Sequence, residues 1–243
     1  MRTVAMFRIG IAVLAGVALF SVVTLAFGQG NDFVPIKVWS KITITPNKAG
    51  TPAHPQGVTA DIRVKIDIPH DYDPPLAKTV DVWMGKGALY NGRKLPTCSE
   101  ATIARSETRA CPKGSIVGYG TAVVDADGVK SYPKGIIVNG GAKKFYVYAM
   151  LSTPARVRQT IVVDVIKLNS PRWSYRLHAD IPRNVQIVAG VPLRPESFHT
   201  VLNRAGWWAS ISCPADHRWP YHAEGVFASG QVVTHDGTVF CRS

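Results

Sequence analysis

The sequence predicts an all-β protein: an antiparallel β-sandwich, immunoglobulin-like or jelly-roll-like, with short helical turns and two disulfides. Three observations lead to this class. Apolar and polar residues alternate with a period of two in about ten short segments. Turn-forming pairs and prolines separate these segments. No strands alternate with long helical patterns, as a parallel sheet would require. We expect one sandwich over residues 29–243, with two smaller sandwiches meeting near residues 152–159 as the alternative.

The clearest strand pattern lies in residues 60–68. Ile62, Val64 and Ile66 point to one face, whereas Arg63 and Lys65 point to the other. Such alternation is typical of a strand with one buried and one solvated face. Similar patterns predict strands at 38–45, 78–84, 116–124, 144–151, 159–167, 173–181, 185–189, 207–213 and 226–234.

Four residue pairs tolerate the positive φ angles that tight hairpin turns require. They are Asn91-Gly92, Asp127-Gly128, Asn139-Gly140 and Asp236-Gly237. Helical patterns are scarce. The better candidate is residues 99–106, where Ser99 could cap the first turn, and the other is residues 195–204.

The first 28 residues have the features of a signal peptide. Arg2 and Arg8 supply positive charge, and residues 9–27 contain no charged side chain. Ala26 and Gly28 stand at the spacing that signal peptidase accepts, so cleavage would leave Gln29 first. The apolar stretch is also long enough to span a bilayer, which keeps an uncleaved signal-anchor as an alternative. We therefore expect a secreted or extracytoplasmic protein.

Four cysteines stand in two close pairs. Export makes disulfides the expected state of paired cysteines, and proximity favours Cys98 with Cys111 and Cys213 with Cys241. A zinc site is the alternative, but no Cys-x-x-Cys spacing supports it. The pairs predict two short stapled loops.

The chain is strongly basic. It has 28 Lys and Arg against 16 Asp and Glu, a net charge of +12, and loss of the two leader arginines lowers it to +10. This charge favours polyanions such as wall polymers, acidic glycans, anionic lipid head groups or nucleic acid. The alternative is that the charge serves solubility alone, because the basic residues are spread along the chain.

Residues 144–151 suggest a ligand-binding face. If Phe145 and Val147 are core residues, then Lys144, Tyr146 and Tyr148 form an exposed basic-aromatic stripe suited to sugars or anionic polymers. The alternative is a strand that is buried on both faces or covered by a neighbouring loop.

The tryptophans suggest a second ligand-binding group. Trp207 and Trp208 should point to opposite faces of a strand, so one of them, with Trp219, is a candidate sugar platform. Trp39, Trp83 and Trp173 are expected in the core.

No cofactor is predicted. His217, His222 and His235 lie near Asp216, Glu224 and Asp236, but their spacing matches no zinc motif, so they are weak metal candidates only. Residues 125–128 begin like a calcium loop yet lack the distal glutamate, and a hairpin turn explains them better. Residues 70–73 are a polar loop that could bind calcium, although a solvated turn is the simpler interpretation. No Gly-x-Ser-x-Gly motif supports a serine nucleophile.

One segment carries a family resemblance. It reads Leu95-Pro96-Thr97-Cys98, then Cys111-Pro112, then Ser115-Ile116-Val117-Gly118-Tyr119-Gly120. This pattern resembles a family of exported actinobacterial proteins that has no established activity. The resemblance implies an envelope β-sandwich and assigns no catalytic residue.

The leading hypothesis is therefore a secreted, non-enzymatic protein of the cell envelope or extracellular space that binds an anionic polymer or glycan. One alternative is a secreted jelly-roll hydrolase or lyase whose catalytic residues the sequence does not identify. The other is a structural or adhesion module that binds a protein through a strand edge. No sequence-specific nucleic-acid binding is expected, and membrane contact is expected only through an uncleaved leader.

Overall fold

A computed structural model describes residues 33–243, which form one compact unit. The predicted signal peptide lies outside these residues. The described part contains 16 strands, one α-helix and two short 3-10 helices. The strands are β1 (Lys37–Thr45), β2 (Gln56–Asp67), β3 (Ala77–Gly85), β4 (Ala88–Tyr90), β5 (Ile116–Ala126), β6 (Val129–Ser131), β7 (Lys134–Asn139), β8 (Lys144–Leu151), β9 (Val157–Lys167), β10 (Trp173–Asp180), β11 (Ile187–Val188), β12 (Val191–Pro192), β13 (Arg194–Leu202), β14 (Trp208–Ser210), β15 (Arg218–Phe227) and β16 (Val232–Phe240). The helices are η1 (Gly92–Lys94), α1 (Glu100–Ser106) and η2 (Arg183–Val185).

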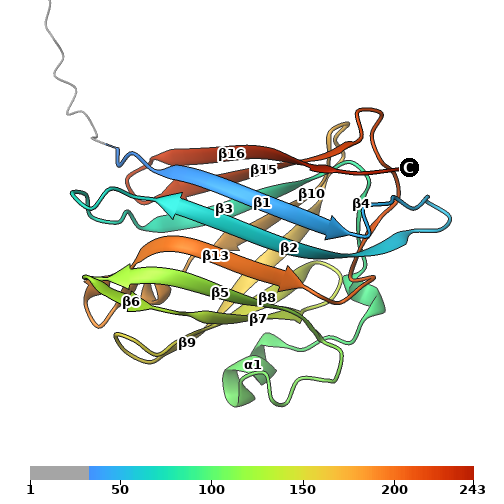
Figure 1. The fold of residues 1–243 in the computed structure, drawn as a ribbon. Coiled ribbons are helices and arrows are strands. Elements are labelled where there is room, and N and C mark those ends of the chain that lie inside the picture. The colour runs from blue at the N-terminus through green and yellow to red at the C-terminus, as the bar shows by residue number, and fades with distance from the viewer. Residues whose placement is uncertain (1–32) are drawn as a thin grey trace, which may run out of the picture. The chain divides into compact units, whose positions relative to one another are not determined.

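Fourteen strands form one antiparallel sheet that folds back on itself. The order is β16-β15-β3-β10-β9-β8-β7-β5-β13-β2-β14-β4, with β1 beside β2 and β6 beside β5. In Figure 1, β1, β2, β13 and β5 cross the near side, whereas β10 and β9 pass behind them. The result is a sandwich-like all-β fold, as the alternating patterns predict.

Aromatic residues fill the core between the two layers. Trp207 is 1% exposed, and its ring packs edge-on against Phe145 and Tyr90. Trp208 packs against Tyr90 and Tyr175. These five rings, with the valines and isoleucines of β5, β7 and β9, bury the inner face of the sheet.

The two ends of the folded sheet meet along a seam between β1 and β16. Ser40 on β1 lies 2.5 Å from the Tyr221 hydroxyl and 2.7 Å from His235 Nε2. Beyond the strand ends, the Ala49 N–H donates to the Arg242 carbonyl over 2.7 Å. β1 and β16 are therefore joined by the side-chain contacts of Ser40 and by the backbone hydrogen bond between Ala49 and Arg242.

Only one of the four predicted turns has the expected form. Asp127 and Gly128 have φ angles of 55° and 83° and connect β5 to β6. Asn91 instead precedes η1, and Asn139 ends β7, where Gly141 rather than Gly140 has a positive φ of 110°. Asp236 and Gly237 lie inside β16, so the turn predicted at these residues is wrong.

Two predicted segments differ from the structure. The sequence predicts a helix over residues 195–204, but residues 195–202 belong to β13, which pairs with β2 and β5 on its two sides. The predicted strand 226–234 crosses the turn between β15 and β16, where Gly230 has a φ of 85°. Pairing with strands distant in the sequence determines the secondary structure of both segments, and the local residue pattern alone does not reveal that pairing.

The other predicted helix and the cysteine pairing are confirmed. Ser99 caps α1 by accepting a hydrogen bond from the Thr102 N–H over 3.1 Å. Disulfides join Cys98 to Cys111 and Cys213 to Cys241. Two disulfides are typical of an oxidising compartment outside the cytoplasm. Within residues 33–243, no helix has the length and hydropathy needed to cross a bilayer.

Candidate functional site

The expected stripe on β8 is covered. Tyr146 and Tyr148 are 5% and 4% exposed, because the disulfide-bonded segment that carries α1 packs on them through Ile103. Burial and Glu107 together raise the pKa of Tyr148. Lys144 is half-buried, and its carbonyl accepts a hydrogen bond from the Tyr90 hydroxyl. The exposed-stripe expectation is therefore wrong, and the covered-strand alternative holds.

The proposed tryptophan platform is also buried. Trp207 precedes β14 in a turn, so the alternation of strand side chains does not separate it from Trp208, and both enter the core. Trp219 is 7% exposed and donates its indole N–H to the Ser212 carbonyl. Trp39, expected in the core, is 51% exposed on the outer face of β1.

The three histidines do not converge. His217 lies before β15 near Phe240, His222 bonds Asp236 on the outer face, and His235 bonds Ser40 in the seam. In the part of the chain that the structure describes, no group of three or more His, Cys, Asp and Glu side chains could hold a metal ion.

Ser40 and His235, 2.7 Å apart, resemble a nucleophile and its base. The serine hydroxyl, however, is also held at 2.5 Å by the Tyr221 hydroxyl between β1 and β15. Within residues 33–243, no carboxylate is hydrogen-bonded to the second nitrogen of His235. The geometry is that of a structural seam, since no third group orients the imidazole for proton transfer.

The outer face of the near layer carries a different set of side chains. Lys41 on β1 pairs with Arg63 on β2, which pairs with His199 on β13. The line continues through Thr121 on β5 to Lys134 on β7. Neighbouring strands lie about 4.8 Å apart, so the row crosses five strands over about 19 Å. We call Lys41, Arg63, His199 and Lys134 the basic row.

Exposed aromatic rings lie on both sides of the basic row. Trp39 stands two residues before Lys41 on the same face of β1, beside Lys65 on β2. Tyr119 stands two residues before Thr121 on β5 and is 50% exposed. Period-two alternation places all of these side chains on the outer face, because their neighbours Ile42 and Ile44 pack inward.

A shallow depression adjoins Trp39. It is lined by Trp39, Lys65, Ile66, Asp67 and Glu196. A bulge between Pro195 and Ser197 in the pairing of β13 with β5 marks the position of Glu196. The depression is open, so it fits an extended ligand on the surface better than an enclosed small molecule.

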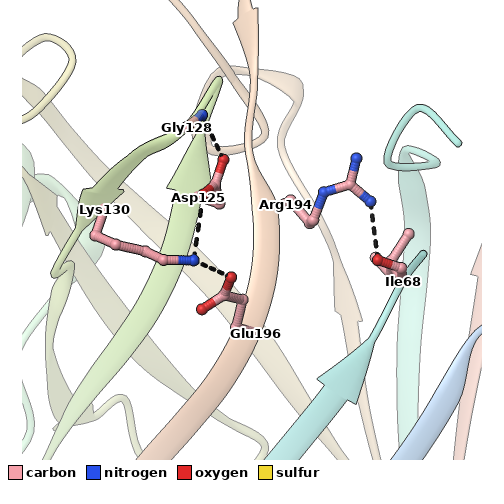
Figure 2. A network of polar contacts seen from close by, with 6 residues as sticks. All are labelled: Ile68, Asp125, Gly128, Lys130, Arg194 and Glu196. Atoms are coloured by element: carbon pink, nitrogen blue, oxygen red, sulfur yellow. Dashed lines mark hydrogen bonds and ion pairs between the residues drawn. The ribbon is translucent and has the colours of Figure 1, made fainter. Parts of the chain in front are cut away.

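Figure 2 shows how Glu196 is neutralised. Its carboxylate pairs with Lys130, which also lies 3.2 Å from Asp125. The Gly128 N–H lowers the pKa of Asp125, with Lys130 assisting, and Glu196 raises the pKa of Lys130. The neighbouring Arg194 guanidinium donates to the Ile68 carbonyl over 3.0 Å. The Glu196 carboxylate, at the border of the depression, is therefore already ion-paired with Lys130.

The basic row has unequal ionic partners. Hydrogen bonds with His199 and Arg63, both 3.1 Å long, hold the pKa of Asp61 below its ordinary value. Asp61 thus stays ionised and offsets the charge of Arg63, and it also hydrogen-bonds His199. Among residues 33–243, however, lysine takes part in ion pairs only at Lys130. Lys41, Lys65 and Lys134 therefore keep uncompensated ammonium groups.

The sequence contained a signal for this surface. Lys37, Trp39 and Lys41 alternate along one strand and form a basic-aromatic pattern. The pattern is of the same kind as that of Lys144, Tyr146 and Tyr148 on β8, but here it is on the outer face. Register across β13 and β5 supplies His199 and Lys134, and no local pattern predicts that register.

No protein-family model matches the sequence, and no curated protein shows significant similarity to it.

Proposed function

We propose that the protein is a non-enzymatic, extracytoplasmic binder of a linear anionic polymer, either a wall polymer or an acidic glycan. The observation that supports the proposal most is the basic row, which crosses five strands between two exposed aromatic rings. Lys41 and Lys134 of the row, together with Lys65 beside Trp39, supply attraction to phosphate or carboxylate groups, and Trp39 supplies an aromatic face for a sugar ring. The net charge of +12 acts in the same direction.

The rigid setting of the row supports the proposal further. All its residues project from paired strands, so the spacing of the charged side chains along the surface is set before the ligand arrives. Preorganisation lowers the entropic cost of binding. Exposed ion pairs contribute only about 0.5 kcal/mol each, so affinity has to come from several contacts along one chain.

The test is the retention of a charge-reversal variant on an immobilised linear polyanion. Lys41→Glu, Lys65→Glu and Lys134→Glu together remove the three unpaired ammonium groups without touching the Asp61 bonds. At about 0.5 kcal/mol each, their loss should weaken binding about tenfold at low salt. Elution of the unmodified protein should require more salt, since screening weakens exposed charges.

A matched control separates this surface from bulk charge. Lys94→Glu, Lys113→Glu and Lys167→Glu change the net charge equally at exposed positions elsewhere. We expect this control to elute close to the unmodified protein. Equal loss of retention in the two triple variants, or no retention of the unmodified protein, would contradict the proposal.

A further inference from the structure

A second surface lies on the outer face of β16, β15, β3 and β10. Its centre is an aromatic patch formed by Trp83, Trp173 and His222. Trp83 on β3 pairs with His222 on β15, and their ring centroids are 5.0 Å apart. Trp173, at the start of β10, lies 6.4 Å from the same imidazole. The three partly exposed rings form one continuous surface.

Strand alternation explains why these rings face outward. Met84 and Leu177 pack against the inner core, so their neighbours Trp83 and Arg176 project from the opposite face. The same alternation sends Tyr221 inward and His222 outward on β15. The tryptophans expected in the core therefore lie on the outside of the sheet.

Two carboxylates orient imidazoles around the patch. His222 Nδ1 lies 3.0 Å from Asp236, and His178 Nδ1 lies 3.0 Å from Asp81. A carboxylate at Nδ1 favours the tautomer with its proton there, which leaves Nε2 of His222 as an acceptor, whereas Nε2 of His178 lies 3.9 Å from Asp180. Arg176 Nε lies 3.5 Å from the buried Asp81, so the guanidinium is fixed beside Trp83.

The rim of the patch adds hydrogen-bond donors. The Arg172 guanidinium lies 4.7 Å from the Trp173 ring centroid. A shallow depression next to it is lined in part by Lys86, Asp216 and Arg218. Aromatic faces, fixed acceptors and arginine donors are thus combined on one surface.

We propose that the aromatic patch binds a neutral saccharide chain. A sugar ring presents an apolar C–H face that packs on an aromatic ring, and its hydroxyls need both donors and acceptors. Glu224, paired with Asp81 across β3 and β15, and Asp164, paired with His178, add further carboxylates to this face. With Asp81, Asp216 and Asp236, these carboxylates offset the charge of Arg172, Arg176, Lys86 and Arg218, so the surface offers a polyanion no net attraction and suits a different ligand from the basic row.

The test is affinity electrophoresis in native gels that contain a neutral β-glucan, a mannan or a galactan. We expect retardation by at least one polysaccharide, unchanged by added salt because no net charge is neutralised. Trp83→Ala and Trp173→Ala should each weaken it about tenfold. Trp83→Phe, which keeps an aromatic ring, should retain most of it. Circular dichroism should confirm that each variant is folded.

Two controls make the result decisive. Trp39→Ala and the Lys41, Lys65 and Lys134 triple variant alter only the other face, so neutral-glycan retardation should persist in both. Loss of retardation in that triple variant, full retardation in Trp83→Ala and Trp173→Ala, or no retardation on any gel would each overturn the proposal. As an independent readout, the bound oligosaccharide should change tryptophan fluorescence in the unmodified protein. Failure here would leave polyanion binding by the basic row intact.

Discussion

Asn139 connects three separate segments through a single buried side chain. Its exposed fraction is 0%. The amide oxygen accepts the Trp207 indole N–H over 3.2 Å, and the amide nitrogen donates to the carbonyls of Gly92, Leu95 and Pro96. The Leu-Pro-x-Cys segment is thereby fixed to the end of β7, which gives that motif an architectural role.

Asn139→Ala should therefore destabilise the protein strongly. It leaves the buried Gly92 carbonyl and the buried Trp207 indole without their partner, and each of these two groups costs about 1–3 kcal/mol; the bonds to the partly buried Leu95 and Pro96 carbonyls are lost as well. We expect the free energy of unfolding to fall by about 3–4 kcal/mol. Urea unfolding with the disulfides intact measures it.

A second asparagine provides the control for this experiment. Asn203 is exposed, and Asn203→Ala should change the free energy of unfolding by less than about 0.5 kcal/mol. A loss below about 1 kcal/mol in Asn139→Ala would show that water or repacking replaces the amide.

At the scale of elements, the sequence predicts those strands, caps and turns that form from interactions between residues close together in the chain. The alternating strand at 60–68 lies within β2 except for its last residue, because one face of it is solvated. Ser99 caps α1 because its hydroxyl reaches the Thr102 N–H without help from distant residues. The Asp127-Gly128 turn forms for the same reason.

Elements and sites that depend on distant partners could not be predicted in this way. Tyr146 and Tyr148 are buried because a segment about 40 residues earlier in the chain covers them. Trp39 is exposed because nothing in the described chain packs over the outer face of β1. The basic row depends on register across five strands, so its residues share no sequence pattern.

The segment that the Cys98–Cys111 disulfide closes should unfold locally when both cysteines are replaced. In the chain-entropy account, closing a loop with a sequence separation of 13 contributes about 3 kcal/mol. Cys98→Ser with Cys111→Ser should lower stability by this amount and loosen α1 over β8. Trypsin should then cut faster at Arg105 and Arg109, both exposed beside α1.

The other disulfide supplies the comparison. Cys213→Ser with Cys241→Ser should cost slightly more stability, about 3.6 kcal/mol, since its loop has a sequence separation of 28. This disulfide lies in a different cluster, with Trp219 and Val239. Equal acceleration of trypsin cleavage at Arg105 in both double variants would indicate global opening rather than local release of α1.

At the scale of the whole molecule, the seam between β1 and β16 determines how the sheet ends. Exposed edge strands are sites of unwanted pairing, and these two edges lie against each other instead. Tyr221 reaches Ser40 by passing over Gly237, where an added Cβ would lie 2.1 Å from the tyrosine ring. The glycine at 237 therefore serves close packing inside a strand, which explains why Asp236-Gly237 is not a turn.

The seam predicts coupling between Ser40 and Gly237. Ser40→Ala removes the partner of Tyr221 and His235, and Gly237→Ala displaces the tyrosine ring, so each should cost about 1–2 kcal/mol. Because both changes break the same hydrogen bond, the double variant should cost less than the sum. Gly135→Ala is the control, since its Cβ would meet Val147 at an ordinary 3.6 Å. Strictly additive losses in urea unfolding would show that Tyr221 does not link the two edges, and the seam would then depend on the Ser40–His235 and Ala49–Arg242 hydrogen bonds.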